Sequence, residues 1–310
     1  GSGSFLIGAY QFLLNWHRDW YIEHLVPTIK EKGATSPEVQ ALLPPTRETS
    51  SRRGRERRRS ATQNLPIYKA GNGTETRTRS DWKLTTAERK RILLNNIYGV
   101  DIDPQAVEVT KLSLLLKVLE DESEESVSKQ LTLFAERALP SLHENIKCGN
   151  SLVAPDIYDD FSIQPSIEER KKLNVFDWER EFAEIVQRGG FNVVIGNPPW
   201  GSSFSPSEQA YLKKNYSSAR GRNIDSYAVF IEFGLKMLNK KGQLSYITPD
   251  TLLRKDDHLS LRNFVFDRYS IVEMIETGPV FPKVRDTWAL VFRMKNEKPT
   301  DRTVITHKNI

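Results

Sequence analysis

The sequence predicts an α/β fold with an open, mostly parallel sheet and crossover helices. Segments with strand-like and helix-like patterns alternate along most of the chain. A continuous apolar run at residues 191–195 is typical of a strand that is buried on both faces. Hydrophobic residues make up 38% of the 310 residues, enough for one large or two ordinary domains. Ligands of such sheets bind beyond the carboxyl ends of the strands, so functional residues are expected there.

The first elements are a long helix and an irregular segment. Residues 5–32 are predicted to be helical, because apolar residues recur at helical spacing and Gly33 is a stop signal. These apolar positions are Phe5, Leu6, Tyr10, Leu13 and Leu14. From about residue 34 to 83 the chain is rich in Pro, Ser, Thr, Gly and Arg, which predicts a basic insertion or mobile loop.

Helix and strand signals alternate after this segment. Thr85 followed by Glu88 predicts a capping box, with a helix through Leu94 and a short strand at 96–100. Asp103 and Pro104 then supply an N-cap and a first-turn proline. The helix they begin carries the apolar residues Val107, Leu112, Leu115, Leu116 and Leu119.

The second half repeats the alternation. The strand at 191–195 follows Gly189 and Gly190 and ends in Gly196-Asn197-Pro198-Pro199-Trp200. Residues 225–238 have one apolar helical face and stop at Lys240-Lys241-Gly242. Strands are predicted at 243–248, 271–275 and 287–292.

Composition indicates a cytoplasmic protein. No run of eighteen apolar residues occurs, and the start lacks the pattern of a secretory signal. One cysteine cannot form an internal disulfide, and five scattered histidines give no zinc-ligand pattern, so we expect no metal.

The net charge of +5 equals the contribution of one arginine-rich run at 52–59, which holds six arginines and one glutamate. This run is equally consistent with a solvated flexible loop and with contacts to DNA phosphates. The arginines are Arg52, Arg53, Arg55, Arg57, Arg58 and Arg59.

Asn197, the two prolines and Trp200 suit methyl transfer to an exocyclic amine. The lone pair of such an amine is delocalised into the base ring, so the amine is a poor nucleophile. The Asn197 side-chain oxygen and a main-chain carbonyl held by the prolines would accept hydrogen bonds from the NH2 group and free that lone pair. Trp200 would stack on a base flipped out of the duplex. The alternative is that Pro198-Pro199 ends a strand and Trp200 packs in the core.

The segment from Gly190 to Trp200 resembles the catalytic motif of the amino-group DNA methyltransferases. In that family Asn or Asp in first place goes with adenine. Trp200 replaces the commoner Tyr or Phe. The resemblance implies S-adenosylmethionine as cofactor, double-stranded DNA as partner and the N6 amine of adenine as the methyl acceptor.

Further segments resemble the cofactor motifs of the same family. Gly1, Gly3 and Phe5 are similar to the end of its glycine-rich loop, although a cloning linker is the rival explanation for Gly-Ser-Gly-Ser. Asp101 takes the place of the acidic residue that binds the ribose hydroxyls, and Ile102 would lie beside the adenine ring. A turn residue is the alternative interpretation of Asp101.

Two more motifs follow in the family's order. Asn150, with Ser151 beside it, takes the place that recognises the adenine amino group of the cofactor, and a plain turn is the alternative. Val280-Phe281-Pro282 resembles the motif whose aromatic residue packs on the flipped base, so Phe281 would face Trp200 or else belong to the core.

The resemblance is to large bacterial and archaeal enzymes, often fused to a nuclease or attached to phage-defence systems. It implies one Rossmann-like class I methyltransferase domain over residues 1–310, with a seven-stranded sheet whose last strand is antiparallel. The first cofactor strand, a target-recognition domain and any restriction nuclease would lie outside this chain. A protein-glutamine methyltransferase and a non-catalytic DNA-binding module of a defence complex are the alternatives.

Overall fold

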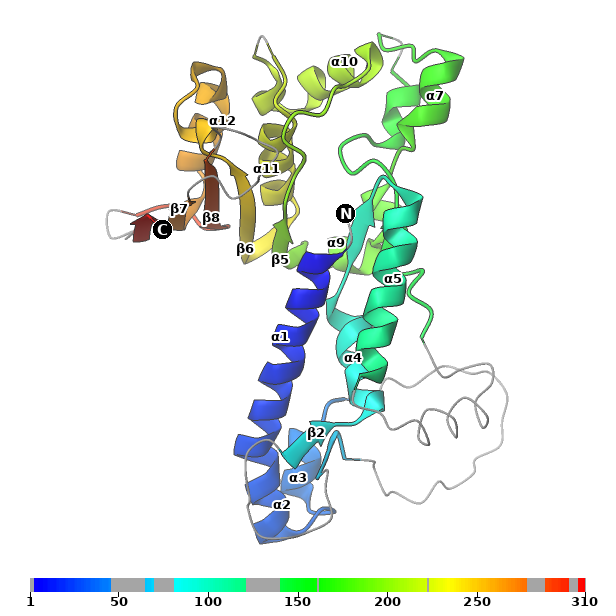
Figure 1. Cartoon of the computed structure of the whole chain (residues 1–310), viewed down its shortest axis with the longest axis vertical. Helices are drawn as coiled ribbons and strands as arrows, with labels where there is room; N and C mark the ends of the chain where they lie inside the picture. Colours follow the sequence, from blue (N-terminus) through cyan, green and yellow to red (C-terminus); the bar gives the residue numbers. More distant parts are fainter. Residues whose placement is uncertain are drawn as a thin grey trace. The chain divides into compact units, whose positions relative to one another are not determined.

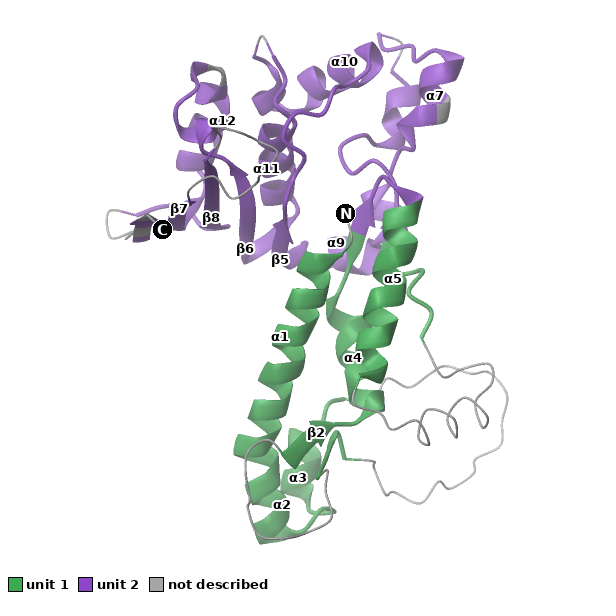
Figure 2. Cartoon of the chain, viewed as in Figure 1, with its two compact units in different colours: residues 1–99, 105–146 green, residues 100–104, 147–310 purple. Residues whose placement is uncertain are grey.

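The chain forms two compact units in a computed structural model, where the sequence predicted one catalytic domain with an insertion (Figure 2). Unit 1 comprises residues 1–99 and 105–146, and unit 2 comprises residues 100–104 and 147–310. The structure describes residues 3–45, 65–69, 81–120, 140–160, 162–221, 223–277, 288–300 and 306–309.

Unit 1 begins with the helical stretch that the sequence predicts. Helix α1 (Ser4–Trp20) continues through a π-helical turn, η1 (Tyr21–Leu25), into α2 (Val26–Lys32) (Figure 1). Gly33 ends it with φ at 86°, a backbone conformation that favours glycine. Tyr10 and Leu25 are fully buried and anchor the core of this unit.

Part of the segment at 34–83 is ordered, contrary to the expectation of a mobile loop. Helix α3 (Pro37–Leu42) is capped by the Ser36 side chain, and β1 (Ile67–Lys69) pairs antiparallel with β2 (Trp82–Leu84). Val39 is 0% exposed and Ile67 is 2% exposed, so isolated apolar residues fix these short elements to the core. The arginines at 52–59 lie outside the described residues.

Helix α4 (Thr86–Asn96) carries half of the expected capping box. The Thr85 hydroxyl accepts from the Glu88 N–H at 3.3 Å, as the sequence predicts. The Glu88 carboxylate instead accepts from the Tyr21 hydroxyl at 2.7 Å and from Arg91. Glu88 is 4% exposed, and a buried carboxylate needs such charge-assisted partners. Helix α5 (Pro104–Leu119) follows.

Unit 2 contains the main sheet, with strand order β5-β6-β8-β7-β9. These strands are β5 (Phe191–Gly196), β6 (Leu238–Pro249), β7 (Ser270–Thr277), β8 (Ala289–Lys295) and β9 (Thr306–Asn309). β5 runs parallel to β6, and β7 runs parallel to β9, while β8 is antiparallel to both of its neighbours.

The α/β class is therefore confirmed, but the described residues do not form the expected seven-stranded sheet. They form this five-stranded sheet and two small ones, β1 with β2, and β3 (Gly99–Asp101) with β4 (Ile146–Cys148).

Strand β5 is not buried on both faces as its apolar sequence predicts. Val193 is 58% exposed, and Asn192 is exposed as well. Among the described residues β5 pairs with β6 alone, so it is an edge strand. Edge position explains why an apolar run typical of a central strand reaches the surface.

Helix α11 (Ser226–Lys236) matches the predicted helix at 225–238 and packs on β6. A Cβ at Gly234 would lie 2.7 Å from the Tyr246 hydroxyl, so glycine permits this close packing. The shorter helices around it complete the unit: η3 (Pro155–Tyr158), α7 (Ile167–Leu173), α8 (Trp178–Glu181), α9 (Ala183–Gln187), α10 (Pro206–Asn215), η4 (Ser217–Ala219), η5 (Asp250–Leu253), η6 (Asp256–His258) and α12 (Leu259–Phe266).

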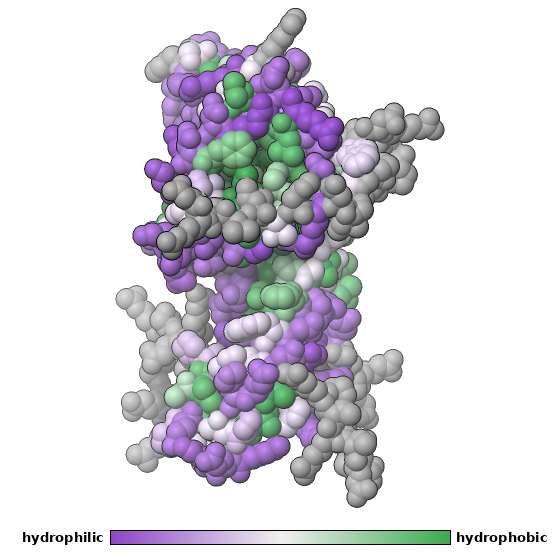
Figure 3. Space-filling view, turned by 90° about the vertical axis from the view of Figure 1, so that its left-hand side faces the viewer, coloured by the Kyte–Doolittle hydropathy of each residue, from purple (hydrophilic) through white to green (hydrophobic). Residues whose placement is uncertain are grey.

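The surface mixes polar and apolar side chains. Figure 3 shows apolar residues gathered in a hollow on the upper part of the view, which is unit 2, with polar residues around them. Large exposed apolar residues of this unit include Leu259, Phe266 and Trp288. No helix in the described part of the chain has the length and hydropathy to span a membrane.

Candidate functional site

The loop Asn197–Trp200 leaves β5 at its carboxyl end, where the sequence places the site. The parallel register pairs Gly196 with Tyr246 of β6, and the loop begins at the next residue. Asn197 is exposed, Pro198 is buried and Trp200 is half-buried. Among the described residues, nothing hydrogen-bonds to the Asn197 side-chain amide.

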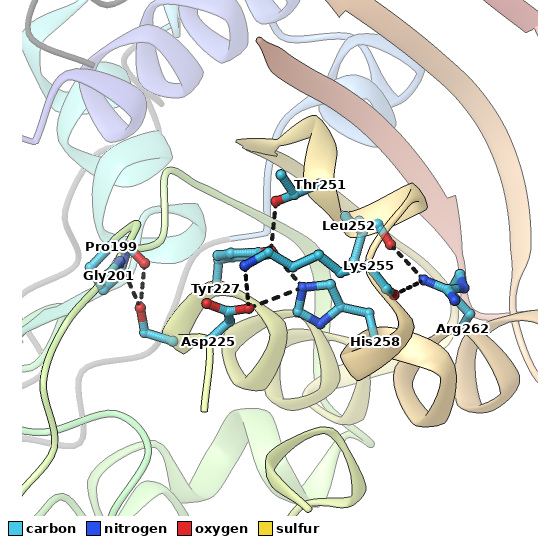
Figure 4. Close-up of polar contacts among 10 residues, drawn as sticks. Pro199, Gly201, Asp225, Tyr227, Thr251, Leu252, Lys255, His258 and Arg262 are labelled. Carbon is cyan, nitrogen blue, oxygen red and sulfur yellow. Dashed lines mark hydrogen bonds and ion pairs between the residues drawn. The ribbon is translucent and has the colours of Figure 1, made fainter. Parts of the chain in front are cut away.

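The hydroxyl of Ser226 holds the second half of this loop. It donates to the Pro199 carbonyl at 2.5 Å and accepts from the N–H groups of Gly201 and Ser202 at 3.4 and 3.3 Å. The dashed lines at Pro199 and Gly201 in Figure 4 mark two of these bonds. Gly201 has φ at 129°, so the turn after Trp200 requires a residue without a Cβ.

The two proline carbonyls therefore differ. The Pro199 carbonyl is engaged by Ser226, whereas no donor among the described residues reaches the Pro198 carbonyl. A carbonyl with two lone pairs and no donor is an available acceptor. Of the two, the Pro198 carbonyl is the one with both lone pairs unused among the described residues.

The Trp200 ring is tied to the neighbouring strand. Its Nε1–H donates to the Ile247 carbonyl of β6 at 3.4 Å. The ring is half-buried, so it is neither a free surface side chain nor a full member of the core. This contact fixes one edge of the indole and opposes rotation of the ring.

Behind Ser226 lies a buried polar cluster (Figure 4). The Tyr227 hydroxyl is 2.7 Å from His258 Nε2 and 3.0 Å from Thr251 Oγ1. Asp225 Oδ2 lies 3.1 Å from the same His258 nitrogen and 3.2 Å from Lys255 Nζ. Burial raises the pKa of Tyr227 to about 12, with Thr251 opposing the shift, so the hydroxyl is protonated at neutral pH.

Arg262 hydrogen-bonds to the segment 250–258, which carries Thr251, Lys255 and His258. Its Nη1 donates to the carbonyls of Leu252 and Lys255 at 3.3 and 2.6 Å (Figure 4). These bonds join the segment 250–258 to α12, and the contacts of Asp225 and Tyr227 join it to the start of α11.

Asp101 and Ile102 stand at the end of β3. Asp101 Oδ1 accepts from the Asp103 N–H at 2.9 Å, and the Asp101 carbonyl accepts from the Gly149 N–H at 2.9 Å. Ile102 is 53% exposed and presents an apolar surface next to the carboxylate. The local bond to Asp103 belongs to the turn interpretation.

Both polar atoms of the Asn150 side chain form hydrogen bonds within the protein. Its Oδ1 accepts from the Leu152 N–H at 3.1 Å, and its Nδ2 donates to Glu208 Oε1 at 3.1 Å. Asn150 is 8% exposed, and the Ser151 carbonyl accepts from Trp178 Nε1 at 3.1 Å. These are contacts of a turn residue, the alternative that the sequence left open, and cofactor recognition by Asn150 stays a prediction.

Gly3 forms the N-cap of α1 with φ at 73°, and a Cβ there would meet the Thr110 side chain at 2.6 Å. Local geometry alone therefore demands glycine at this position. Phe5 is 47% exposed on the first turn of α1. Gly1, Phe281 and the six arginines lie outside the described residues, and their roles stay predictions.

Sequence reasoning missed the residues that support the loop. Ser226 and Tyr227 lie at the start of the predicted helix at 225–238, and His258 belongs to no recognisable motif. Asp225, Ser226 and Tyr227 are three consecutive residues with hydrogen-bonding side chains at the start of a helix. This was the one signal in the sequence that pointed to a supporting role. In the described ranges, no three His, Cys, Asp or Glu side chains are placed to hold a metal ion.

Comparison with known proteins gives one family and several longer relatives. Residues 95–281, more than half of the chain, match the model of the Eco57I restriction-modification methylase family. A type II restriction enzyme and methyltransferase, RM.Eco57I of Escherichia coli, is 31% identical over 202 residues, covering 64% of this chain and 18% of that protein. The putative enzyme RM.MjaORFECS2P of Methanocaldococcus jannaschii is 22% identical over 299 residues, covering 61% of this chain and 25% of that protein.

The chain thus spans about a quarter or less of the length of these two relatives. Among solved structures, the DrdV–DNA complex is 13% identical with a TM-score of 0.48, covering 73% of this chain and 22% of that one. The family match includes Asp101, Asn150 and the Asn197–Trp200 loop. The chain belongs to the Eco57I restriction-modification methylase family.

Proposed function

We propose that this chain carries the transfer site of a DNA methyltransferase that moves a methyl group from S-adenosylmethionine to the N6 amine of a flipped-out adenine. The observation that carries the proposal is the pair of acceptors at the end of β5. Asn197 is exposed and its side chain has no partner among the described residues, and the adjacent Pro198 carbonyl receives no donor there. Family membership supports the reaction class.

These two acceptors match the two hydrogens of an exocyclic amine. When Asn197 Oδ1 and the Pro198 carbonyl each accept one N–H, the nitrogen moves towards tetrahedral geometry and its lone pair leaves the ring system. The amine nitrogen would then attack the sulfonium methyl carbon, so that the N–C bond forms as the S–C bond breaks and S-adenosylhomocysteine leaves. The methylated nitrogen would afterwards lose one proton to solvent. Because Ser226 already donates to the Pro199 carbonyl, the second acceptor is assigned to Pro198.

The Trp200 ring supplies the apolar surface for the base. Stacking on an aromatic ring contributes about 1–3 kcal/mol per base, which offsets part of the few kcal/mol needed for flipping. The bond from Trp200 Nε1 to the Ile247 carbonyl holds the ring in place. Phe281 is the predicted partner on the other face of the base.

Asp101 and Ile102 fit the cofactor that the family implies. The half-buried carboxylate of Asp101 stands at a strand end, where a charged acceptor of two ribose hydroxyls is expected, and the exposed Ile102 beside it offers contact to an adenine ring. S-adenosylmethionine supplies an electrophilic methyl group on its sulfonium. Asn150 and Ser151 would contribute to its adenine pocket, and Gly3 and Phe5 would border its methionine end.

We further infer that the chain works within a larger restriction-modification protein. The relatives are described as restriction enzyme and methyltransferase in one chain, and this chain covers 18% and 25% of their lengths. The nuclease and the domain that recognises the DNA sequence would therefore lie outside these residues. The arginine run at 52–59 is the proposed phosphate contact within them.

The test uses the protein at its full natural length with labelled S-adenosylmethionine and DNA of mixed sequence. The modified nucleoside is identified by mass spectrometry after digestion, and the Asn197→Ala variant is the control. We expect N6-methyladenine with the parent protein and none with the variant.

Other products would redirect the assignment. A methylated cytosine would replace adenine as the substrate. Label in protein with none in DNA would identify a protein-amide methyltransferase, because a glutamine amide presents the same weak nucleophile. Cofactor binding with no transfer to either substrate would leave a DNA-binding role.

A further inference from the structure

We propose that Ser226 is a positioning residue of the transfer site, whose hydroxyl sets the path of the loop from Pro199 to Ser202. This inference rests on the proposed function and names a residue outside the Asn-Pro-Pro-Trp motif. Its basis is a three-way contact of one side-chain oxygen with Pro199, Gly201 and Ser202.

The contact differs from ordinary helix capping. Ser226 is the first residue of α11, and the preceding residue, Asp225, is the N-cap and makes no side-chain cap bond. Each bond of the Ser226 hydroxyl goes to the loop after β5, 24 to 27 residues earlier in the chain. Ser226 is 0% exposed, so its hydroxyl has no exchange with bulk water in this arrangement.

This three-way contact of the Ser226 hydroxyl, called the Ser226 clamp below, also affects which proline carbonyl accepts from the substrate. By donating to the Pro199 carbonyl, Ser226 turns that group towards α11. Two torsions of Pro199 separate its own carbonyl from the peptide plane that holds the Pro198 carbonyl: the ring fixes φ, whereas ψ is soft. By holding the Pro199 carbonyl, the Ser226 bond restrains ψ and so limits the orientation of the Pro198 carbonyl relative to the loop from Pro199 to Ser202.

The neighbours of Ser226 keep its own position fixed. Tyr227 is bound to His258 and Thr251, and Asp225 is bound to His258 and Lys255. Tyr227 and His258 are 3% and 2% exposed. The helix start is thus held by the buried Tyr227–His258 bond on one side of the serine and by the more exposed contacts of Asp225 on the other, and it cannot shift without breaking them.

The first test measures the loop directly and does not need activity. Deuterium uptake of a peptide covering residues 200–203 is compared between Ser226→Ala and the parent protein. The matched control is Ser218→Ala, because Ser218 is 5% exposed and no described residue hydrogen-bonds to its hydroxyl. We expect faster exchange of the Gly201 and Ser202 amides in Ser226→Ala alone.

The second test measures catalysis with the full-length protein. We expect Ser226→Ala to lower kcat by about ten- to a hundredfold, the scale of a misplaced reacting group, with KM for S-adenosylmethionine nearly unchanged. The melting temperatures of Ser226→Ala and Ser218→Ala are also measured, so that a smaller folded fraction is not mistaken for a lower kcat. Ser226→Thr retains the hydroxyl, and recovery of the slow exchange and of part of kcat would identify the hydroxyl as the active group.

The outcomes separate this inference from the proposed function. Unchanged exchange at Gly201 and Ser202 in a folded Ser226→Ala protein overturns the clamp, whatever the reaction is. Faster exchange with an unchanged kcat overturns the positioning role. Faster exchange in a protein whose parent form transfers no methyl group leaves the clamp in place and removes the proposed function.

Discussion

The hydroxyl of Tyr227 lies 2.7 Å from Nε2 of His258, and the two residues come from different elements, α11 and η6. Neither residue contacts a substrate in the proposed mechanism. Their contact joins the helix that carries Ser226 to the segment that follows β6. Removal of one partner should therefore be measurable first as a loss of stability.

The Tyr227→Phe variant should destabilise the protein by about 1–3 kcal/mol, because buried polar groups of His258 and Thr251 lose a partner. Urea denaturation followed by tryptophan fluorescence measures the change. A double-mutant cycle with Thr251→Val separates the two bonds, and a coupling energy near zero would exclude a direct Tyr227–Thr251 contribution.

Replacement of Asn197 by alanine should abolish methyl transfer and leave cofactor affinity unchanged, because only the acceptor of the substrate amine is removed. Single-turnover rates and calorimetric titration with S-adenosylhomocysteine measure the two effects. Asn192→Ala is the matched control, since Asn192 is an exposed asparagine on β5, the strand that precedes the loop of Asn197. Equal turnover of both variants would remove Asn197 from the mechanism.

The Asp101→Ala variant should weaken cofactor binding by about 1.5–3 kcal/mol through loss of a charged hydrogen-bond partner. The structure adds a second contribution, because Asp101 Oδ1 also accepts from the Asp103 N–H. Asp101→Asn keeps an oxygen for that turn and removes the charge. If Asp101→Asn binds the cofactor as tightly as the parent protein, the carboxylate has no role with the ribose.

Trp200→Phe should retain an aromatic plane and lose the bond to the Ile247 carbonyl. We expect a fall of a few fold in kcat, corresponding to about 0.5–1.5 kcal/mol for one hydrogen bond. Trp200→Ala should cost more, by the roughly 1–3 kcal/mol of base stacking. Steady-state kinetics on methylatable DNA compares them, and equal losses in both variants would contradict a stacking role.

Glu232 should make the stability of unit 2 depend on pH in the acid range. Burial raises the pKa of this carboxyl, but the hydrogen bonds from Lys236 and from the Ser218 N–H lower it by more than burial raises it. The pKa of Glu232 is therefore below the ordinary 4.5. A folded pKa below the unfolded one means that the stabilisation is complete above about pH 4.5 and is lost as pH falls through the lowered value.

The Glu232→Gln variant should therefore be less stable at neutral pH. Its free energy of unfolding should also change less than that of the parent protein as the pH falls. The unfolding free energy is measured by denaturant titration between pH 3 and pH 7. Glu179→Gln, at an exposed glutamate of α8, is the control. Parallel pH curves for the parent and Glu232→Gln would contradict this assignment.

The sequence predicted the local features of the fold better than the contacts between distant segments. The helix at 225–238 and the strand before Asn197 were predictable, because periodicity and glycine or proline punctuation are local. The contact of Ser226 with Pro199 spans 27 residues and leaves no periodic trace. The same holds for His258, which is isolated in the sequence and buried in the structure.

Short ordered elements were missed for a related reason. Helix α3 depends on the cap Ser36-Pro37 and one buried residue, Val39, and these were obscured by the surrounding composition. Strand β9 consists of Thr306–Asn309, which has no apolar pattern, and it is recognisable only by its pairing with β7. The burial of β5 was overestimated because sequence indicates hydrophobicity but not the number of neighbouring strands.

Cys148 is the one cysteine of the sequence, and it is exposed at the end of β4. Its Sγ lies 3.6 Å from the Ile102 carbonyl, and the next residue, Gly149, donates to the Asp101 carbonyl at 2.9 Å. A maleimide dye or spin label would therefore attach at a single known position next to the residues assigned to the ribose. Within these 310 residues, Cys148 is thus the single thiol at which such a label can report cofactor binding.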